Sequence, residues 1–247
     1  AAGTGTVRVH RRPRVAVLST GDELVPAGDA LRHGQIHDSN SVLLAACVRA
    51  AGAEPVVLGP VRDDPAVLRA LLVDLESGRA GGSVDALVTS GGVSMGAYDV
   101  VKQVLGELAD VELVKVAMQP GKPQGLGRLP GGTPVLALPG NPVSVFVSFE
   151  VLVRPVLLAV AGRDDLERPE VVAEVTDGWS TPPGRTQFMP VVLEEHATGA
   201  RVRRAVAGGS GSHLVAGLAR AEGLAVIDAA VEAVAPGDKV RVMLVTP

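Results

Sequence analysis

The chain has 247 residues, of which 47% are apolar and 20% charged, and its mean hydropathy is +0.30. These values exclude an intrinsically disordered chain, which has low hydrophobicity and high net charge. The net charge is −4, aromatic residues make up 2% and no basic stripe is present, so we expect no nucleic-acid partner. The single cysteine, Cys47, excludes an internal disulfide and a cysteine metal cluster.

Hydropathy gives no sign of a membrane protein. No run approaches the roughly 18 uncharged apolar residues of a membrane span, and the N-terminal segment lacks the apolar core of a signal peptide. We therefore expect a cytoplasmic protein that does not bind membranes. Because the chain starts at Ala1 without methionine and soon enters a strand-like stretch, we expect it to be the C-terminal part of a longer protein.

Residues 14–162, which follow a lead-in over 1–13, alternate short β-branched runs with helical segments, as α/β units with a parallel sheet do. Two helix starts are explicit: Ser39 or Asn40 precedes a helix over 41–51, and Asp64 precedes a helix with Pro65 at its first position. Strands are predicted over 14–19, 54–61, 84–90, 111–118 and 134–138, further helices end near 108 and span 142–161, and 119–132 is predicted as turns.

The pattern changes after a linker over 163–168. Short alternating runs, broken by glycine and proline, predict a small antiparallel β domain over 169–247. The expected strands cover 169–177, 187–196, 200–206, 223–228 and 237–245.

The segment SGGVSMGAYD, residues 90–99, is the most informative loop. It follows a buried strand and opens a helix, where free N–H groups attract phosphate and glycines allow a close approach to the backbone. An ordinary tight turn is the alternative. The segment lacks both the Walker spacing and GxGxxG, which disfavours ordinary nucleoside triphosphate or NAD binding.

Carboxylates follow two strands at the same edge of the predicted sheet. STGDEL places Asp22 and Glu23 after the first strand, and VRDDP places Asp63 and Asp64 after the second. Such side chains hold Mg²⁺ through water, although a solvated loop explains the first pair and helix capping explains Asp64. Asp99 lies in the first turn of its helix, where the helix dipole alone stabilises a carboxylate.

Two further loops reach this edge. In PGNPVS, residues 139–144, Asn141 caps the helix that Pro142 begins. The loop after residue 114 adds Lys115 and Lys122 beside the carboxylates, as an anionic ligand with a divalent metal would require, although Lys115 could equally lie along a sheet edge. In the β domain, Arg185 and Ser212 lie in turn-like segments. These segments either present the two side chains to a ligand or are ordinary hairpin turns.

Six motifs together resemble one enzyme family. VAVLSTGDELVPAG, GQIHDSN, VRDDP, TSGGVSMGAYD, VAMQPGKPQ and LALPGNPVSVFVSFEVLVRPVL occur in the order found in molybdopterin molybdenumtransferase, the MoeA family, which includes the gephyrin E region. The match runs from about residue 7 to 162 and continues more weakly over 169–247.

The resemblance implies a three-layer molybdopterin-binding α/β domain with a mostly parallel sheet, followed by a small antiparallel β-barrel. It also implies magnesium-dependent insertion of molybdate into adenylyl-molybdopterin with release of AMP. The implied catalytic residues are Glu23, Asp64, Asp99, Lys115 and Lys122, of which the three carboxylates would serve Mg²⁺. The implied pterin and phosphate contacts are Thr20, Gly21, Ser90, Gly91, Gly92, Ser94, Pro139, Gly140, Asn141, Pro142, Ser144, Arg185 and Ser212.

The chain departs from the family at two points. Gln119 stands where many relatives carry lysine, and nothing here corresponds to two N-terminal domains that contribute to a homodimer and a composite site. Molybdopterin adenylyltransferase is an implied partner. It is also an alternative identity, since it shares the α/β domain, and a pterin-binding scaffold module without turnover is a third reading.

Overall fold

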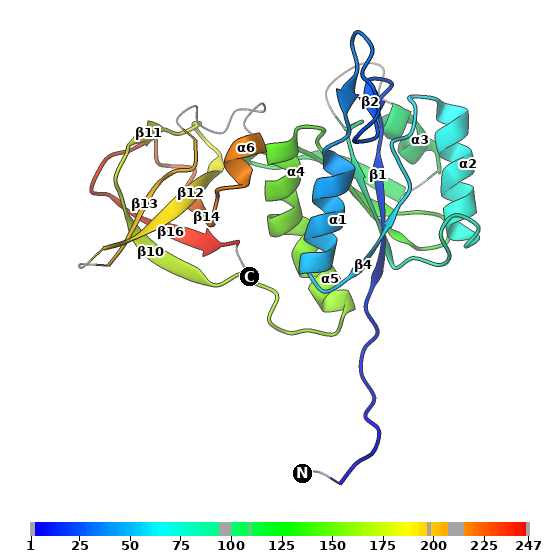
Figure 1. The fold of residues 1–247 in the computed structure, drawn as a ribbon, viewed down its shortest axis with the longest axis horizontal. Coiled ribbons are helices and arrows are strands. Elements are labelled where there is room, and N and C mark those ends of the chain that lie inside the picture. The colour runs from blue at the N-terminus through cyan, green and yellow to red at the C-terminus, as the bar shows by residue number, and fades with distance from the viewer. Residues whose placement is uncertain (1–2, 94–99, 109, 197–198, 207–214, 246–247) are drawn as a thin grey trace.

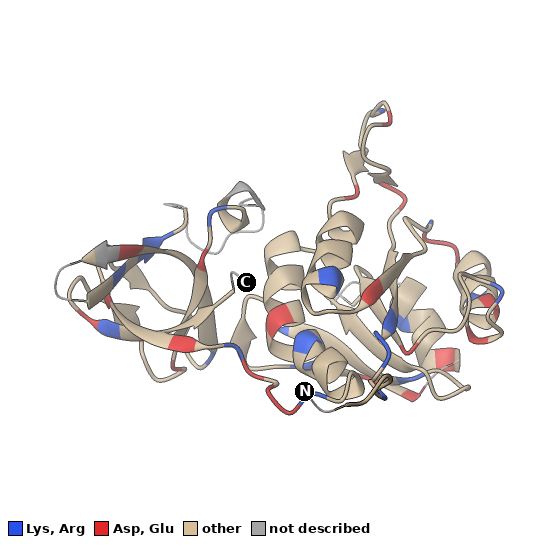
Figure 2. Ribbon diagram, turned by 60° about the horizontal axis from the view of Figure 1, so that its bottom comes forward, with Lys and Arg blue, Asp and Glu red and all other residues tan. Residues whose placement is uncertain are grey.

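The computed structural model describes residues 3–93, 100–108, 110–196, 199–206 and 215–245. Figure 1 shows two bodies side by side, an α/β domain and a smaller barrel, joined by an extended segment after α5 (Arg154–Val160). Acidic and basic residues are interspersed over both bodies in Figure 2. The fold class expected from the sequence is confirmed.

The α/β domain is built on one six-stranded sheet with a mostly parallel arrangement. Its strands, in spatial order, are β4 (Glu54–Val57), β1 (Arg14–Ser19), β5 (Ala86–Ser90), β9 (Pro134–Leu138), β8 (Pro123–Arg128) and β6 (Asp110–Lys115). The first four are mutually parallel, and β8 runs antiparallel to both of its neighbours. The carboxyl ends of β1, β5 and β9 therefore meet at one edge.

Helices cover both faces of this sheet. One face carries α1 (Asn40–Ala50) and a continuous helix formed by α4 (Pro142–Ser148), the π-helical turn η1 (Phe149–Val153) and α5. The other face carries α2 (Pro65–Glu76) and α3 (Val100–Leu108). Because both faces are covered, β5 and all but the first residue of β1 are buried, which explains their unbroken apolar runs.

The helix starts follow the predicted capping chemistry at two of three places. Asp64 and Asn141 accept backbone N–H bonds at the starts of α2 and α4, each followed by proline. At α1, Ser39 makes no side-chain cap bond, and Asn40 already belongs to the helix. Asp38 Oδ1 instead accepts from the N–H of Ser41 at 3.0 Å. The predicted N-cap position, Ser39, is confirmed, but the side-chain bond to the helix start comes from the aspartate one position earlier.

The predicted turn region after residue 118 is partly wrong. The segment Pro123–Arg128 is strand β8, and its glycines follow from the packing of the sheet. A Cβ at Gly127 would lie 1.8 Å from the Asp110 carbonyl oxygen, so a side chain there would overlap the neighbouring strand. The predicted strand over 111–118 is also divided into β6 and the short β7 (Met118–Gln119).

One helix is longer and more apolar than the hydropathy expectation allowed. Pro142–Val160 is long and apolar enough to cross a membrane by length and composition, and 61% of it is buried in the protein. It contains Glu150 and Arg154, and its apolar residues Phe149, Val153 and Leu157 pack on the sheet. The helix is therefore a core element of this fold. Cys47 on α1 is likewise buried in the core, as expected, and desolvation raises the pKa of its thiol to about 12.

The C-terminal body is a closed five-stranded barrel. Its strands are β10 (Glu170–Val175), β12 (Thr186–His196), β13 (Gly199–Arg204), β14 (Gly223–Ile227) and β16 (Lys239–Leu244). The β12–β13 pairing closes the ring β13-β10-β16-β14-β12. Four of the pairings are antiparallel, as predicted, and β10 with β13 is parallel. The sequence pattern missed β11 (Trp179–Ser180), α6 (Val215–Leu218) and β15 (Ala233–Val234), which are short.

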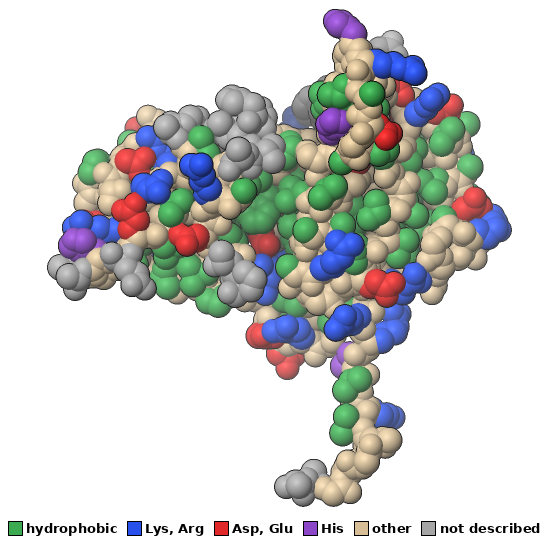
Figure 3. All heavy atoms as spheres, in the orientation of Figure 1, with side chains coloured by type: hydrophobic (Ala, Val, Ile, Leu, Met, Phe, Trp, Pro, Cys, Tyr) green, Lys and Arg blue, Asp and Glu red, His purple; other side chains and the backbone are tan. Residues whose placement is uncertain are grey.

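The two bodies are joined by backbone and apolar contacts. Strand β7 leaves the α/β domain and pairs with β12 of the barrel through Thr186↔Met118 and Gln187↔Gln119. An apolar cluster at the joint includes Met118, Val147 and Leu224. Hydrophobic side chains are visible along this seam in Figure 3.

Candidate active site

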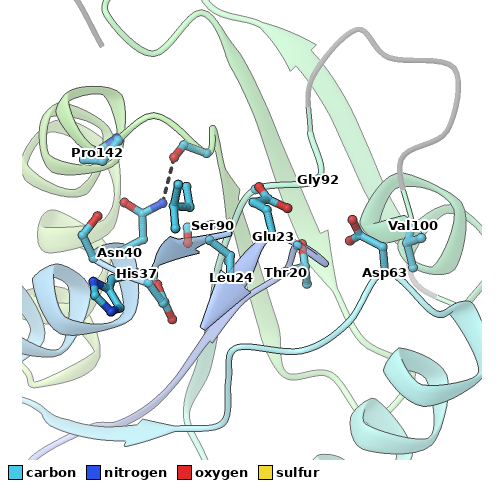
Figure 4. A pocket seen from close by; sticks show the side chains of 16 residues that line it. Thr20, Glu23, Leu24, His37, Asn40, Asp63, Ser90, Gly92, Val100 and Pro142 are labelled. Atoms are coloured by element: carbon cyan, nitrogen blue, oxygen red, sulfur yellow. Dashed lines mark hydrogen bonds between the residues drawn. The ribbon is translucent and has the colours of Figure 1, made fainter. Parts of the chain in front are cut away.

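A cavity of about 320 Å³ lies at the carboxyl edge of the sheet, where β1, β4, β5 and β9 end. Figure 4 shows it from close by, with Asn40 on one side and Asp63 and Val100 on the other. Its lining residues are Thr20, Gly21, Glu23, Leu24, Ile36, His37, Asp38, Ser39, Asn40, Asp63, Ser90, Gly91, Gly92, Val100, Gly140 and Pro142. Loops that are distant in the sequence thus converge, as expected at this edge of an α/β sheet.

The loop after β5 has a backbone that requires glycine. Gly91 and Gly92 have φ of +90° and +71°, and the Gly91 N–H donates to the carbonyl of Leu138 on β9 at 3.1 Å. A Cβ on Gly91 would lie 3.0 Å from the Thr20 carbonyl oxygen. The glycine therefore permits the ends of β1, β5 and β9 to approach each other at the cavity. Ser94 and Asp99, further along this loop, lie outside the described residues.

Buried hydroxyl groups fasten the strand ends beneath the cavity. The Ser19 hydroxyl is 2.9 Å from that of Ser41, on α1, and 2.9 Å from that of Ser90, at the end of β5. All three side chains are buried. Since hydroxyl groups both donate and accept, this chain of contacts satisfies polar groups that would otherwise destabilise the core.

Acidic side chains give the cavity its charge. Glu23, Asp38 and Asp63 line it, and none of its described lining residues is lysine or arginine. The Glu23 carboxylate folds back over Gly21, where a Cβ would lie 2.5 Å from Oε2. In Figure 4 the Glu23 and Asp63 side chains lie at the cavity, and they come from the loops that follow β1 and β4. Mg²⁺ binds through one or two protein carboxylates together with substrate phosphates, so Glu23 and Asp63 are enough to hold such an ion.

The Asp63–Asp64 pair is divided between two environments. Asp64 does not line the cavity, and its Oδ1 accepts from the N–H groups of Ala66 and Val67 at 2.8 and 3.3 Å. The metal role that the resemblance gives to Asp64 stays a prediction, and the structure places Asp63 in the cavity instead. Within the described ranges, no group of three His, Cys, Asp or Glu side chains forms a metal cluster.

Asp38 and Asn40 are cavity residues that sequence reasoning did not select. They come from GQIHDSN, immediately before and at the start of α1, and are 4% and 8% exposed. The Asn40 amide donates to the carbonyl of Gly140 at 2.8 Å, which links α1 to the PGNP loop (Figure 4). The sequence does show polar residues just before an apolar helix, but helix capping explained them, so no binding role was predicted.

The PGNPVS loop contributes to the cavity mainly through backbone and ring atoms. Gly140 and Pro142 line the cavity, whereas Pro139, Asn141 and Ser144 do not. Asn141 Oδ1 accepts from the Val143 N–H at 2.9 Å, so its cap is confirmed. Ser144 is buried in the helix below.

The expected cations do not line the cavity. Lys115 and Lys122 stand at the β6 and β8 end of the sheet, separated from β1 by β9 and β5, and neither lines the cavity. Because β6 and β9 are both antiparallel to β8, Lys115 at the end of β6 and Lys122 at the start of β8 lie at the same edge of the sheet as the acidic loops. Their placement beside the carboxylates stays a prediction. Their role toward an anion stays a prediction. Arg185 donates to Gln119 Oε1 at 2.6 Å across the domain joint, and Ser212 lies outside the described residues.

Comparison with known proteins gives matches over both bodies. Residues 16–159 match a family described as "Probable molybdopterin binding domain", and residues 172–245 match "MoeA C-terminal region (domain IV)". Molybdopterin molybdenumtransferase 2 of Mycobacterium tuberculosis is 45% identical over 98% of this chain, which spans 59% of that relative. Molybdopterin molybdenumtransferase of Nostoc sp. is 45% identical over 63% of this chain and 35% of its own length.

A solved structure agrees with these sequence matches. The molybdopterin biosynthesis moea protein from Pyrococcus horikosii superimposes with a TM-score of 0.78 at 36% identity, covering 96% of this chain and 55% of that one. The first family model alone covers more than half of the 247 residues. The chain therefore belongs to the MoeA family, with a molybdopterin-binding α/β domain followed by the family's C-terminal barrel.

Proposed function

We propose that this chain carries the catalytic part of a molybdopterin molybdenumtransferase, which inserts molybdate into adenylylated molybdopterin and releases AMP in a Mg²⁺-dependent reaction. One observation carries the proposal: the glycine loop at Gly91 and the carboxylates of Glu23 and Asp63 share one cavity in a chain matched by both family models. The M. tuberculosis and Nostoc relatives are named molybdopterin molybdenumtransferases, which supports the transferase part of the proposal.

Charge determines how these residues would act. Glycine at Gly91 and Gly92 allows the phosphate of the adenylate to lie against the backbone, while Glu23 and Asp63 repel that phosphate unless a cation lies between them. When bound, Mg²⁺ would supply charge neutralisation at the phosphate oxygens. The residues that would hold it are Glu23 and Asp63, with Asp64 and Asp99 as the candidates from the family resemblance.

The assembly and the compartment are part of the same proposal. The chain spans 59% and 57% of the length of the two M. tuberculosis relatives. We propose a homodimer in the full-length protein, a functional partnership with a molybdopterin adenylyltransferase, and a cytoplasmic location.

Two other functions give different experimental results. An adenylyltransferase would form the adenylate from ATP and molybdopterin, and a scaffold module would bind the pterin without turnover. The barrel, with its match to the MoeA C-terminal region, favours the molybdenumtransferase over the adenylyltransferase.

The deciding experiment measures AMP release from adenylylated molybdopterin by the purified chain, with Mg²⁺ and molybdate omitted in turn. Release that requires both ions supports the proposal, and Glu23→Gln should reduce it by at least about tenfold. Glu112→Gln, an equal change on the exposed strand β6, is the matched control and should leave the rate unaltered. Tight pterin-nucleotide binding without AMP release would instead identify a scaffold module, and ATP-dependent adenylate formation would identify the adenylyltransferase.

A further inference from the structure

Asp38 and Asn40 each have one polar atom fixed by the protein and one that has no partner. Asp38 Oδ1 accepts from Ser41 N–H, and Asn40 Nδ2 donates to the Gly140 carbonyl. The remaining atoms, Asp38 Oδ2 and Asn40 Oδ1, are buried and have no hydrogen-bond partner among the described residues. Leaving a buried polar atom unpaired costs about 1–3 kcal/mol, so native proteins rarely tolerate two such atoms at one place without a use for them.

The fixed bonds determine the chemical character of the spare atoms. Turning the Asn40 amide over would bring its oxygen against the Gly140 carbonyl oxygen, so the spare atom of Asn40 is an acceptor. The spare atom of Asp38 is a carboxylate oxygen, also an acceptor. Both residues line the cavity and both are more than nine-tenths buried, so its wall beside α1 holds two acceptors without a partner in the described part of the chain, and the Thr20 hydroxyl is a third such unpartnered group of the lining.

We propose that Asp38 and Asn40 bind the 2-amino-4-oxopyrimidine edge of a ligand, which presents an exocyclic amine and an adjacent ring N–H. Two neighbouring donors match two acceptors, whereas adenine presents one amine beside a ring nitrogen that accepts and would be repelled. A pterin carries this edge and so does guanine. Naming the pterin rests on the proposed function, while the edge itself follows from the two acceptors.

The inference extends the roles of the loops around the cavity. The Gly91 loop and the carboxylates of Glu23 and Asp63 serve the phosphate side, and the α1 wall selects the heterocycle. Figure 4 shows Asn40 and Asp63 at opposite sides of the view, with Thr20 and Glu23 between them. One cavity thus has separate walls for the two ends of a pterin nucleotide.

Binding of free heterocycles tests the edge without any turnover. Pterin, which is fluorescent, is titrated with the purified chain and compared with lumazine, in which an oxo group replaces the 2-amino group, and with GMP and AMP. We expect pterin to bind at least about tenfold more tightly than lumazine, and GMP more tightly than AMP. Lumazine binding as tightly as pterin, or the absence of both pterin and GMP binding, would overturn the proposal.

Variants locate the effect at the two acceptors. Asp38→Asn and Asn40→Ala should each weaken pterin binding about tenfold, the equivalent of roughly 1.4 kcal/mol, and leave lumazine binding nearly unchanged. Asp29→Asn removes the same charge from the exposed loop that precedes α1 and serves as the matched control. Melting curves check that each variant is folded, and Asn40→Ala tests the edge should Asp38→Asn prove unstable.

Unchanged pterin binding in both folded variants would contradict the proposal. The binding titration tests the pterin edge and the AMP-release assay tests the enzymatic activity, so either proposal can be rejected while the other stands. Loss of pterin selectivity in Asp38→Asn while wild-type chain releases no AMP would support the edge and reject the enzymatic activity. AMP release with no discrimination between pterin and lumazine would do the reverse.

Discussion

Glu150 and Arg168 form a buried ion pair at the joint between the two domains. The guanidinium donates to both carboxylate oxygens, at 2.9 and 3.2 Å, and the two side chains are only 3% and 12% exposed. Glu150 lies in the π-helical turn of the long helix, and Arg168 lies just before the first barrel strand. The pair therefore ties the segment between the domains to the core of the first one.

Breaking this pair should destabilise the protein strongly. Glu150→Ala or Arg168→Ala leaves a buried charge without its partner, and we expect a loss of about 3–5 kcal/mol in unfolding free energy. Replacing both residues together, by Glu150→Leu and Arg168→Met, should cost less than either single change because no unpaired charge remains. Urea unfolding measures the difference, and a double variant less stable than both single ones would contradict this account.

An exposed pair supplies the control. Arg241 and Glu170 make a similar contact on the barrel surface, at 3.1 Å, with side chains 63% and 41% exposed. Arg241→Ala should change stability by no more than about 1 kcal/mol. A comparable loss at both sites would show that burial is not the cause.

Two glycines with the same backbone angle distinguish conformational strain from crowding. Gly91 and Gly132 have φ of +90° and +91°, and a Cβ meets the Thr20 carbonyl oxygen at 3.0 Å in the first and nothing within 4 Å in the second. Gly132→Ala should therefore cost about 1 kcal/mol from the left-handed backbone alone. Gly91→Ala should cost more, and it should also weaken ligand binding in the cavity. Equal losses of stability would remove the argument that Gly91 is required by close approach.

The sequence predicted the fold where one physical signal dominated. Strands β1 and β9 were predicted at their observed bounds, because unbroken apolar runs mark strands covered on both faces. The starts of α2 and α4 were predicted because an Asp or Asn directly before a proline is typical of a helix N-cap. Strand β8 was missed, since a glycine-rich strand is recognised only when the neighbouring strand that excludes its side chains is known.

The candidate site was predictable in its loops and less so in its residues. Parallel strands bring their carboxyl ends together, so the TGDE, VRDDP, SGG and PGN loops were expected to converge, and their cavity residues do. Which of Asp63 and Asp64 faces the cavity depends on a local backbone geometry that no pattern carries. The positions of Lys115 and Lys122 depended on the strand order of the sheet, which spacing along the chain does not determine.

Asp85 should give part of the stability a defined pH dependence. The Arg11 guanidinium, followed by the Arg14 N–H, lowers the pKa of this carboxyl, while burial opposes them. A depressed folded-state pKa contributes stability above the unfolded value of about 3.9, and that contribution is lost as pH falls through the folded pKa. The difference in unfolding free energy between wild type and Asp85→Asn should be constant above about pH 5 and should shrink below about pH 4. Arg11→Met keeps the Arg14 donor, so it should lower the unfolding free energy less than Asp85→Asn does. A stability difference between wild type and Asp85→Asn that grows on acidification would contradict the lowered pKa of Asp85.

Asp63 and Asp64 provide a direct test of which carboxylate serves the metal. Asp63 lines the cavity, whereas Asp64 Oδ1 is engaged as the N-cap of α2. Serine is a good N-cap, so Asp64→Ser keeps the helix start while removing the carboxylate, and Asp63→Ser is the same chemical change one position earlier. We expect Asp63→Ser to lower AMP release by at least about tenfold and to raise the Mg²⁺ concentration needed, because a carboxylate that binds the ion is lost. Asp64→Ser should leave the rate and the Mg²⁺ requirement within a few-fold of wild type. The opposite result, in which only Asp64→Ser changes the Mg²⁺ requirement, would restore the assignment implied by the family resemblance and would mean that the loop between β4 and α2 rearranges when metal and substrate bind.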